Sequence, residues 1–403
     1  MEILLIGLLM IFGLMLGVLG SYLFHVPRVV GYILAGVLFA PDFLGGPLGA
    51  QATEWTQSIV AVTFGVIASR IGGAATVSQL RQLGWMIVGA TLGKVSGSFV
   101  AVLAGFTLLG ATVADVPAWT LALLLAAIAT TTAPGAIMAI IYQYRARGPL
   151  TTSLLAMVAL DDALALVIFS LALAAIESTG FVAAIPVVIW EIVAAIGLGT
   201  AGGYVLERGA RFLPEPELKL AALLGAIILL AGLADAWYFS PLLAAMALGF
   251  SARLFAGAHS EPLFQPLEQL QEVVYVLFFT LAGLHFTPAV VLEHAGLIVL
   301  YFLLRAGGQI VGALVGAQLA GAPRVISHNV GLIMLPQGGV AIGMALMLTG
   351  VSSLEDSALL IINIVTASTL LTETFGAVAT RFGLSRAGEL GQAAESTKTK
   401  EST

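Results

Sequence analysis

Two adjacent carboxylates interrupt an apolar stretch of the chain, which reads Leu154-Leu-Ala-Met-Val-Ala-Leu-Asp161-Asp162-Ala-Leu-Ala-Leu-Val-Ile-Phe-Ser-Leu171. The stretch is long enough to cross a lipid bilayer as a helix. Each charged side chain at membrane depth costs roughly 2.5–3.5 kcal/mol on insertion scales, and neighbouring carboxylates also repel each other. Packing alone does not explain such a pair. We therefore predict a buried site at Asp161 and Asp162 where a cation and a proton compete.

The composition is that of a membrane protein. Of the 403 residues, 59% are hydrophobic and only 9% are charged, whereas a soluble domain carries about 25% charged residues. The mean hydropathy of +1.05 agrees, and these values together predict an all-α polytopic membrane protein in contact with membrane lipid. No cysteine is present, which excludes disulfides and thiolate metal sites. Nothing in the sequence suggests binding to nucleic acid.

Hydropathy and helix-breaking residues divide the chain into thirteen apolar segments, each predicted to be a transmembrane helix. Their approximate ranges are 3–24, 28–41, 56–75, 82–110, 117–143, 150–176, 182–206, 218–237, 240–256, 267–286, 290–319, 325–350 and 355–381. The first is too long and too apolar for a signal peptide, so we interpret it as the first span. The predicted transmembrane domain covers residues 1–381, and the polar residues 382–403 are predicted to form a disordered cytoplasmic tail.

The loop charges predict the orientation of the chain. Thirteen spans place the two termini on opposite sides of the membrane. All basic residues outside the spans then fall on one side, and the opposite loops hold only acidic ones. By the positive-inside rule, the N-terminus lies outside and the C-terminus lies in the cytoplasm. The basic set is Arg28, Arg81, Arg145, Arg147, Arg208, Arg211, Lys219, Arg253, Arg324, Arg381, Arg386, Lys398 and Lys400.

The sequence contains an internal repeat of six segments. Pro134 interrupts the fifth segment and Pro336 the twelfth, and Asp161 and Asn363 each follow their proline by 27 positions. The run from Pro27 to Gly36 likewise resembles the run from Pro241 to Gly249. We predict repeat one at about 3–176, a linker helix at about 182–206 and repeat two at about 218–381. The two copies are offset by seven segments. Because seven is an odd number of membrane crossings, the second copy is inverted in the membrane. Inverted repeats with crossed discontinuous helices are typical of secondary transporters.

The break at Pro134 predicts a cluster of oxygen atoms. Proline removes a backbone donor and frees carbonyls near Thr130 and Thr131, and irregular backbone at membrane depth is tolerated only where it is buried in protein or lines a cavity. The hydroxyls of Thr130, Thr131 and Thr132 are further candidate ligands for a hard cation. The alternative is a simple proline kink, with these hydroxyls bonded to their own helix.

Two basic residues inside the spans are candidate partners for the acids. Asp161 and Asp162 lie about 100° apart around a helix, so one can face a cation while the other meets a positive charge. Arg305 and Lys94 can supply that charge, because glycines at short spacing beside both let their helices approach closely.

Other polar residues inside the predicted spans include two accessory candidates and an arginine. Glu373 and Asn363 are accessory candidates, and for Glu373 a helix-pairing role and a site role remain equally open. The arginine, Arg70, has no partner that the sequence identifies.

The chain resembles the monovalent cation:proton antiporter family, the bacterial sodium/proton exchangers and their Kef-type potassium/proton relatives. The Asp-Asp pair and the two interrupted segments are the specific part of the resemblance. The matching stretches cover nearly the whole chain: Val30-Gly-Tyr-Ile-Leu-Ala-Gly36, Thr131-Thr-Ala-Pro134, Arg145-Ala-Arg-Gly-Pro149, Ala159-Leu-Asp-Asp162, Phe278-Phe-Thr-Leu-Ala-Gly-Leu284, Leu335-Pro-Gln-Gly-Gly-Val340, and Ser368-Thr369 with Glu373.

The resemblance implies a homodimer of thirteen-helix protomers, each with a dimerisation domain and a mobile core domain. It implies that Asp162 carries the ion or the proton and that Asp161 pairs with Arg305. Two departures stand out: many sodium-transporting relatives carry lysine at the position of Arg305, and a Gly-Leu-Glu motif common in relatives is replaced here by Arg70-Ile-Gly-Gly-Ala74. The nucleotide-binding domain of the Kef-type relatives is absent from this chain.

The expected function is therefore transport and not enzymatic catalysis. We expect an inner-membrane antiporter that admits protons and expels Na⁺, with the monovalent cation at Asp162 and no cofactor. Li⁺ and K⁺ remain open as substrates, since selectivity depends on cavity size and ligand number. Two other classes also remain open, a sodium-coupled solute symporter and a non-transporting sensor of the same fold. If Arg305 holds Asp161 throughout, exchange is one cation for one proton.

Overall fold

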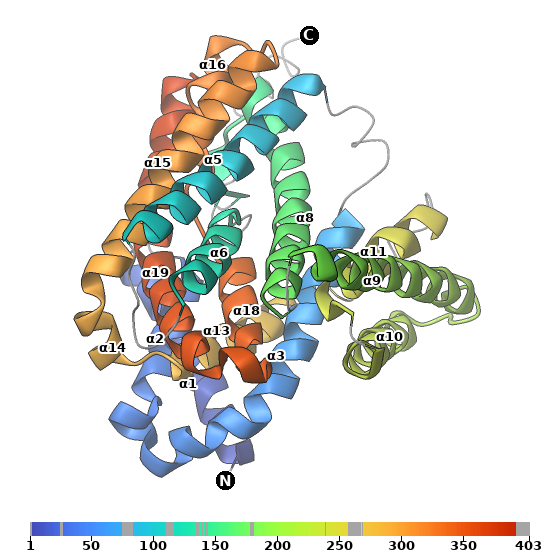
Figure 1. The fold of residues 1–403 in the computed structure, drawn as a ribbon. Helices are drawn as coiled ribbons and strands as arrows, with labels where there is room; N and C mark the ends of the chain where they lie inside the picture. Colours follow the sequence, from blue (N-terminus) through green and yellow to red (C-terminus); the bar gives the residue numbers. More distant parts are fainter. Residues whose placement is uncertain are drawn as a thin grey trace.

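The computed structural model describes residues 2–24, 27–74, 84–109, 117–133, 137–138, 140–141, 144–177, 181–237, 239–256, 267 and 269–391. Over these ranges the secondary structure is helical, without a β-strand (Figure 1). The predicted break at Pro134 and the predicted tail residues 392–403 lie outside the described residues.

The helices follow the apolar segments that the sequence predicts. Two segments that carry breakers are divided: the fifth ends its first helix early, and the twelfth contains two short helices and a longer one. The bounds are α1 (Glu2–Phe24), α2 (Arg28–Leu38), α3 (Gly46–Ala74), α5 (Trp85–Leu109), α6 (Ala118–Ala129), α8 (Pro149–Glu177), α9 (Phe181–Ala210), α10 (Pro216–Trp237), α11 (Pro241–Ala256), α13 (Gln271–Leu284), α14 (Pro288–Glu293), α15 (Ala295–Leu319), α16 (Arg324–Ser327), α17 (Val330–Ile333), α18 (Gly339–Met347) and α19 (Glu355–Arg386).

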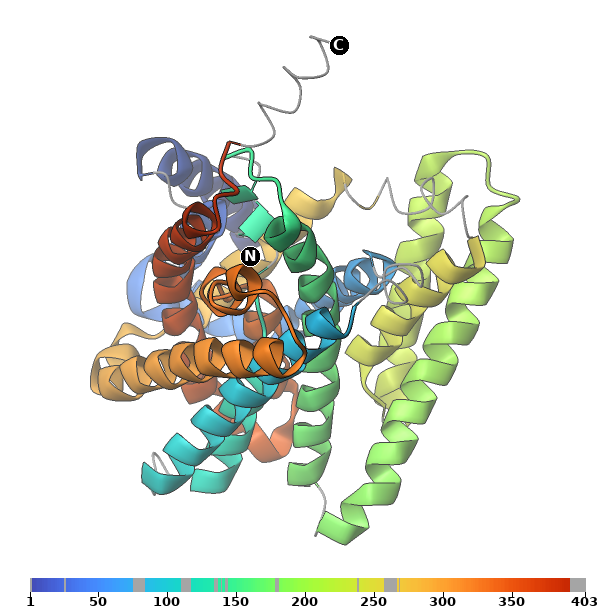
Figure 2. The same ribbon diagram turned by 90° about the horizontal axis from the view of Figure 1, so that it is seen from above.

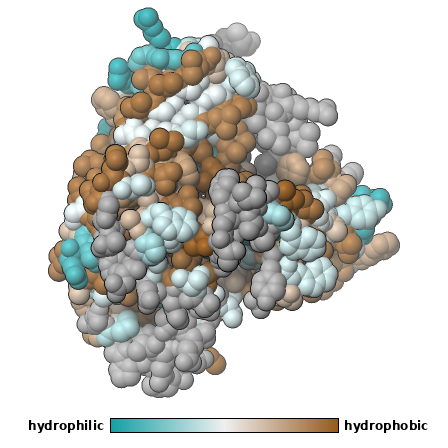
Figure 3. Space-filling model, viewed as in Figure 1, coloured by the Kyte–Doolittle hydropathy of each residue, from teal (hydrophilic) through white to brown (hydrophobic). Residues whose placement is uncertain are grey.

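The outer surface of the bundle is suited to lipid. Six helices in the described ranges are long and apolar enough to cross a membrane, among them α5, α15 and α19. Val299, Leu303 and Val311 are half-exposed or more along α15, and large apolar areas cover the face drawn in Figure 3. The prediction of a multi-pass membrane protein is confirmed. The total of thirteen crossings stays a prediction, because several of the helices are shorter than a bilayer requires.

The packing follows the inverted repeat. Helix α2 packs on α13, and its repeat mate α11 packs on α3. Both contacts rest on glycine: a Cβ atom on Gly36 would lie 2.0 Å from the carbonyl oxygen of Thr280, and one on Gly249 would lie 1.9 Å from that of Ser69. These are the glycines that end the Pro27–Gly36 and Pro241–Gly249 runs. The helices α5 and α15, the next pair of repeat mates, pack against each other.

The helices form two groups. Helix α9, the predicted linker, packs on α11 and α10, and these three lie together on one side of the molecule (Figures 1 and 2). The helices that carry the candidate site residues, α5, α6, α8, α15 and α17–α19, lie together on the other side. Within this second group, 72% of the most apolar window of α19 is buried, against 33% for α5 and 28% for α15, so α19 lies in its interior.

The end of the chain differs from the prediction. Helix α19 continues to Arg386, and Glu389 is buried. The Glu389 carboxylate accepts hydrogen bonds from the backbone nitrogens of Leu150 at 2.7 Å and Thr151 at 2.8 Å. The predicted start of a disordered tail at residue 382 is therefore wrong. The composition suggested disorder, but Glu389 caps the free backbone donors at the start of α8.

Candidate functional site

Two breaks in the helices meet at the centre of the second group. Helix α6 ends at Ala129, and Thr131, Thr132 and Ala133 continue without helical structure. The second break runs from Leu335 to Gly338, between α17 and α18. The backbone nitrogen of Ala133 donates to the carbonyl oxygen of Pro336 at 2.8 Å. The two breaks therefore lie against each other, as crossed discontinuous helices require.

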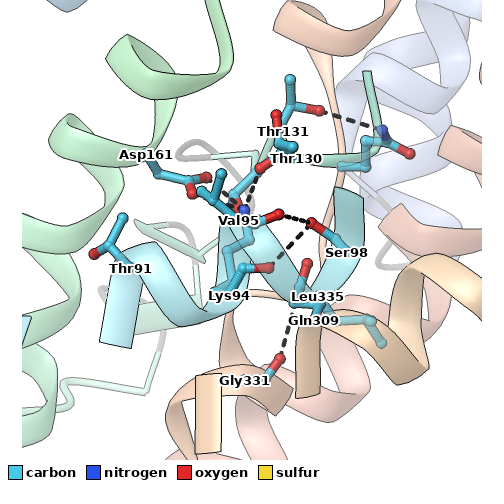
Figure 4. A network of polar contacts seen from close by, with 12 residues as sticks. Thr91, Lys94, Val95, Ser98, Thr130, Thr131, Asp161, Gln309, Gly331 and Leu335 are labelled. Atoms are coloured by element: carbon cyan, nitrogen blue, oxygen red, sulfur yellow. Dashed lines mark hydrogen bonds and ion pairs between the residues drawn. The ribbon is translucent and has the colours of Figure 1, made fainter. Parts of the chain in front are cut away.

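Lys94 on α5 holds the first break and Asp161. Its Nζ lies 2.8 Å from Oδ1 and 2.7 Å from Oδ2 of Asp161 on α8. The same nitrogen donates to Oγ1 of Thr132 at 2.7 Å and to the carbonyl oxygen of Thr130. Figure 4 shows the Lys94 nitrogen between Asp161 and Thr130. Both charged side chains are completely buried, so a proton or an ion must reach them through the protein.

Arg305 on α15 connects the two breaks. Its Nη1 donates to the carbonyl oxygen of Leu335 at 2.9 Å and its Nη2 to that of Thr131 at 2.7 Å. The expected pair between Arg305 and Asp161 is therefore wrong, and Asp161 pairs with Lys94. The reason is geometric: the planar fork of the guanidinium can reach one carbonyl on each break, whereas the compact ammonium fits between one carboxylate and one break.

Backbone contact between α5 and α15 places both cations at the breaks. A Cβ atom on Gly93 would lie 2.3 Å from the carbonyl oxygen of Gly312, and one on Gly97 would lie 2.2 Å from that of Gly308. Small residues permit such an approach of two helices in a membrane. The glycine spacing beside Lys94 and Arg305 correctly indicated close packing, and the structure shows that the two helices pack on each other.

Asp162 differs from Asp161 in its surroundings. It is buried, and its Oδ1 accepts no hydrogen bond from the residues that the structure describes. Buried polar atoms nearly always have a hydrogen-bond partner, and an exception indicates a bound water or ion or a chemical role. Since the neighbouring residue Asp161 is already neutralised by Lys94, Asp162 is the carboxylate of the pair that remains available for a cation or a proton.

The hydroxyl groups of the threonines at the first break bond carbonyl oxygens of their own helix. Oγ1 of Thr130 donates to the carbonyl oxygen of Ala127 at 2.7 Å, and Oγ1 of Thr131 donates to that of Ile128 at 2.9 Å. This is the self-bonded arrangement that the sequence left open as the alternative. The carbonyl oxygen of Thr130 accepts a hydrogen bond from Lys94, and that of Thr131 accepts one from Arg305. The role of the threonines as cation ligands stays a prediction.

Gln337 is a site residue that the sequence reasoning did not single out. Its Nε2 lies 3.1 Å from the carbonyl oxygen of Ile128, 3.2 Å from Oγ1 of Thr131 and 3.1 Å from Oη of Tyr301. It therefore bridges the second break, the end of α6 and α15. The signal was present: Gln337 is a polar residue beside Pro336, and a polar group at a membrane break needs several partners.

The remaining candidates lie in different places. Asn363 is bonded at the α13–α14 connection, where its Oδ1 accepts from the backbone nitrogen of Thr287 at 2.7 Å. Glu373 is buried on α19, and its Oε1 lies 3.1 Å from the position of a Cβ atom on Gly338, beside the second break. Arg70 on α3 lies 6.0 Å from the ring centroid of Tyr275, a cation–π distance, which supplies the partner that the sequence did not identify.

The donor set does not resemble a site for a bound divalent metal. Among the residues that the structure describes, no three His, Cys, Asp or Glu side chains come together as ligands. Crossed broken helices, with one buried carboxylate paired to Lys94 and a second buried carboxylate beside it, are typical of an ion-coupled secondary transporter.

The comparisons with known proteins identify the family. Residues 5–380 match the family described as "Sodium/hydrogen exchanger, transmembrane", and the chain belongs to this family of cation/proton antiporters. The resemblance to monovalent cation:proton antiporters is thereby confirmed. It is a family of transporters and not of enzymes. No curated protein matches the chain.

Two solved structures show the same fold. The structure of the sodium proton antiporter MjNhaP1 from Methanocaldococcus jannaschii at pH 8 aligns with a TM-score of 0.77 and 19% identity, over 96% of this chain and 100% of that one. An electron-microscopy map of the same protein aligns with a TM-score of 0.72 and 16% identity, over 97% of each chain. At these identities the likeness establishes the fold alone.

Proposed function

We propose that the protein exchanges Na⁺ for protons by alternating access, with Asp162 as the site that the two ions share. The observation that carries this proposal is the contrast between the two carboxylates. Lys94 neutralises Asp161 at 2.7 Å, whereas the buried Oδ1 of Asp162 lacks a partner among the described residues. An unpaired carboxylate at this depth is costly, and either a cation or a proton removes that cost.

Competition at one carboxylate couples the two fluxes. With Na⁺ or a proton bound, Asp162 is neutral, and the helices that carry the site can move relative to the rest of the molecule. With neither bound, the site retains its charge and resists the move. The site therefore carries Na⁺ across in one direction and a proton in the other. It does not return empty, so one ion does not leak across alone. No nucleotide is required, because the ion gradients supply the free energy.

The moving parts follow from the two groups of helices. We propose that α5, α6, α8, α15 and α17–α19 move as one body, and that the other helices form the stationary part and the contact between the two protomers of a homodimer. In the proposed setting, the inner membrane of a bacterium, the N-terminus faces outward and the C-terminus faces the cytoplasm. The protein then admits protons and expels Na⁺.

Proteoliposomes with a pH-sensitive dye inside test the proposal. The wild-type protein should move protons when Na⁺ is added, and Asp162→Asn should abolish this response without loss of thermal stability. Glu293→Gln is the matched control, because Glu293 is an exposed carboxylate at the end of α14 and its loss should leave exchange intact. Na⁺-dependent exchange by a folded Asp162→Asn protein would overturn the assignment.

The same assay separates the alternatives. A larger proton response to K⁺ than to Na⁺ identifies a potassium/proton antiporter. Na⁺ uptake that depends on an added organic solute identifies a symporter. Absence of ion flux with every monovalent cation identifies a sensor. The available Oδ1 of Asp162 favours ion transport over a sensor, since a sensor has no need to keep a buried carboxylate oxygen without a partner.

A further inference from the structure

Helix α19 carries buried hydroxyl groups that are not hydrogen-bonded. Oγ1 of Thr366, Oγ of Ser368 and Oγ1 of Thr369 lack a partner among the described residues, and all three residues are completely buried. This is not the usual state of a hydroxyl in these helices: Oγ1 of Thr280, for example, donates to the carbonyl oxygen of Val276 at 2.7 Å. Unpartnered buried polar atoms indicate water or an ion that completes their hydrogen bonds.

Two of these hydroxyls share a helix face with Glu373. Thr366, Thr369 and Glu373 follow one another at spacings of three and four residues, which places them in a row along one side of α19. Glu373 is 3% exposed, and its Oε1 lies next to Gly338. The row therefore runs from the second break toward the N-terminal end of α19, at Glu355. Gly338 has no side chain, which leaves room for the carboxyl group at the break.

Glu373 has no positive partner among the described residues. None of the ion pairs involves it. The charged or titratable side chains on the elements that pack on α19 are engaged elsewhere. On α15, Arg305 bonds the carbonyls of both breaks and Tyr301 bonds Gln337. On α13, Glu272 bonds Arg28, Tyr275 lies under Arg70, and His285 at its end bonds the carbonyl oxygen of Leu281. Glu293 on α14 is exposed. Nothing on these elements compensates a negative charge at Glu373.

We propose that Glu373 is a second proton-binding carboxyl group of the transport cycle, and that Thr366 and Thr369 line the water path by which the proton reaches it. A buried carboxyl group without a positive partner is tolerated in its neutral form. Hydroxyls both donate and accept hydrogen bonds, so they can order water in a path that conducts protons in either direction. The inference rests on the proposed exchange function, but it concerns a group other than Asp162.

Infrared difference spectroscopy tests proton binding without transport. When the pH of the purified protein is changed, the carbonyl stretch of a protonated carboxyl group should appear or disappear, and Glu373→Gln should remove one such band. Asp162→Asn should leave that band in place. Identical difference spectra for the wild type and Glu373→Gln would overturn the proposal, whatever the outcome for exchange.

Transport measurements test the role in the cycle. If two carboxyl groups compete for protons with the cation, the logarithm of the apparent KM should fall more steeply with pH in the wild type than in Glu373→Gln. At alkaline pH, where competition ends, the two proteins should have the same KM. Glu373→Asp should restore the wild-type slope, which a merely structural role does not predict. An unchanged slope in Glu373→Gln would overturn the proposal.

A second pair of variants tests the path and keeps Glu373 in place. Thr369→Val removes a buried, unpartnered hydroxyl at nearly constant volume and should slow maximal exchange several-fold without changing the KM slope. Thr374→Val is the control, because that hydroxyl is exposed and bonds the carbonyl oxygen of Leu370 at 2.9 Å. Equal rates for the two variants would remove Thr369 from the path. If the wild-type protein shows no exchange, the proposed function is refuted. The infrared measurement still tests whether Glu373 binds a proton.

Discussion

At the scale of single residues, Lys94 and Arg305 stabilise different parts of the site. Lys94 neutralises Asp161 and one carbonyl of the first break, while Arg305 joins the carbonyls of both breaks. Each cation satisfies carbonyls that the interrupted helices leave without a partner. We therefore propose that the charge of Asp161 stabilises the structure and that the charge of Asp162 is available for exchange.

The Lys94–Asp161 pair predicts an effect on stability. Asp161→Asn leaves the Lys94 ammonium buried without its counter-charge, and truncation of one partner of a buried pair typically costs about 3–5 kcal/mol. We expect a clear decrease in the melting temperature of the detergent-solubilised protein. The control is Arg28→Gln, which removes an ion pair to Glu272 with side chains 56% and 44% exposed, where about 0–1 kcal/mol is expected. Equal shifts for the two variants would contradict the assignment.

Competition at Asp162 predicts the pH dependence of transport. A lower pH should raise the apparent KM for the cation and leave the maximal rate nearly constant, because saturating cation displaces the proton from the carboxylate. Initial rates of proton flux over a grid of pH and Na⁺ concentration measure both quantities. Acid inhibition that saturating Na⁺ fails to relieve would show that another group, separate from the exchange site, senses pH.

The sequence predicted the members of the site but not their pairing. Asp161, Asp162, Lys94 and Arg305 are conspicuous because each is a charge inside an apolar segment. Which cation meets Asp161 depends on the crossing of α5, α15 and the two breaks, a matter of a few ångströms that spacing along the chain does not fix. The unpaired hydroxyls of α19 were also beyond prediction, because their state depends on the neighbours of a buried helix.

At the scale of elements, the α5–α15 contact predicts the effect of a single methyl group. In Gly312→Ala, the added Cβ would lie 2.1 Å from the carbonyl oxygen of Gly93, so the two helices must separate and move Lys94 and Arg305 from the breaks. Overpacking of this kind costs about 1–3 kcal/mol, and we expect lower thermal stability and slower exchange. Gly307→Ala on the same helix is the control, since no atom lies within 4 Å of its Cβ position. A stable, active Gly312→Ala protein would show that the contact is not required.

The end of α19 predicts a second effect on an element. Glu389 accepts hydrogen bonds from the backbone nitrogens of Leu150 and Thr151, and a negative charge at a helix N-terminus is favourable. Glu389→Gln should therefore destabilise α8, the helix of Asp161 and Asp162, by roughly 1–3 kcal/mol. Thermal unfolding measures the change. The control is Glu217→Gln, an exposed acid in the first turn of α10. Should both variants melt alike, the cap contributes nothing specific.

Helix positions were the most predictable elements. Hydropathy located the apolar segments and the prolines located the interruptions, because both follow from the cost of exposing polar backbone to lipid. The order at residues 387–391 was not predictable, since it comes from one carboxylate that meets the start of α8 across a long separation in sequence.

At the scale of the whole molecule, the pairing of Asp161 changes the expected charge movement. The one-for-one, electroneutral exchange expected from the sequence required a permanently charged arginine on Asp161. The structure places Lys94 there, and a lysine can release its proton when a cation binds nearby, whereas an arginine does not. We therefore expect more than one proton per cation and electrogenic exchange.

A membrane potential should then drive transport by itself. A potential is worth about 2.3 kcal/mol per elementary charge per 100 mV, so a K⁺ diffusion potential set by valinomycin should move Na⁺ in the absence of a Na⁺ or proton gradient. Asp162→Asn proteoliposomes measure the leak, and a folded Lys94→Arg protein should respond less to the potential than the wild type while Na⁺/proton exchange continues. If the potential moves no Na⁺ in the wild type, then exchange is electroneutral and Lys94 keeps its proton throughout the cycle. The pair at Asp161 would in that case serve structure alone, and the coupling of the whole molecule would rest on its carboxyl groups.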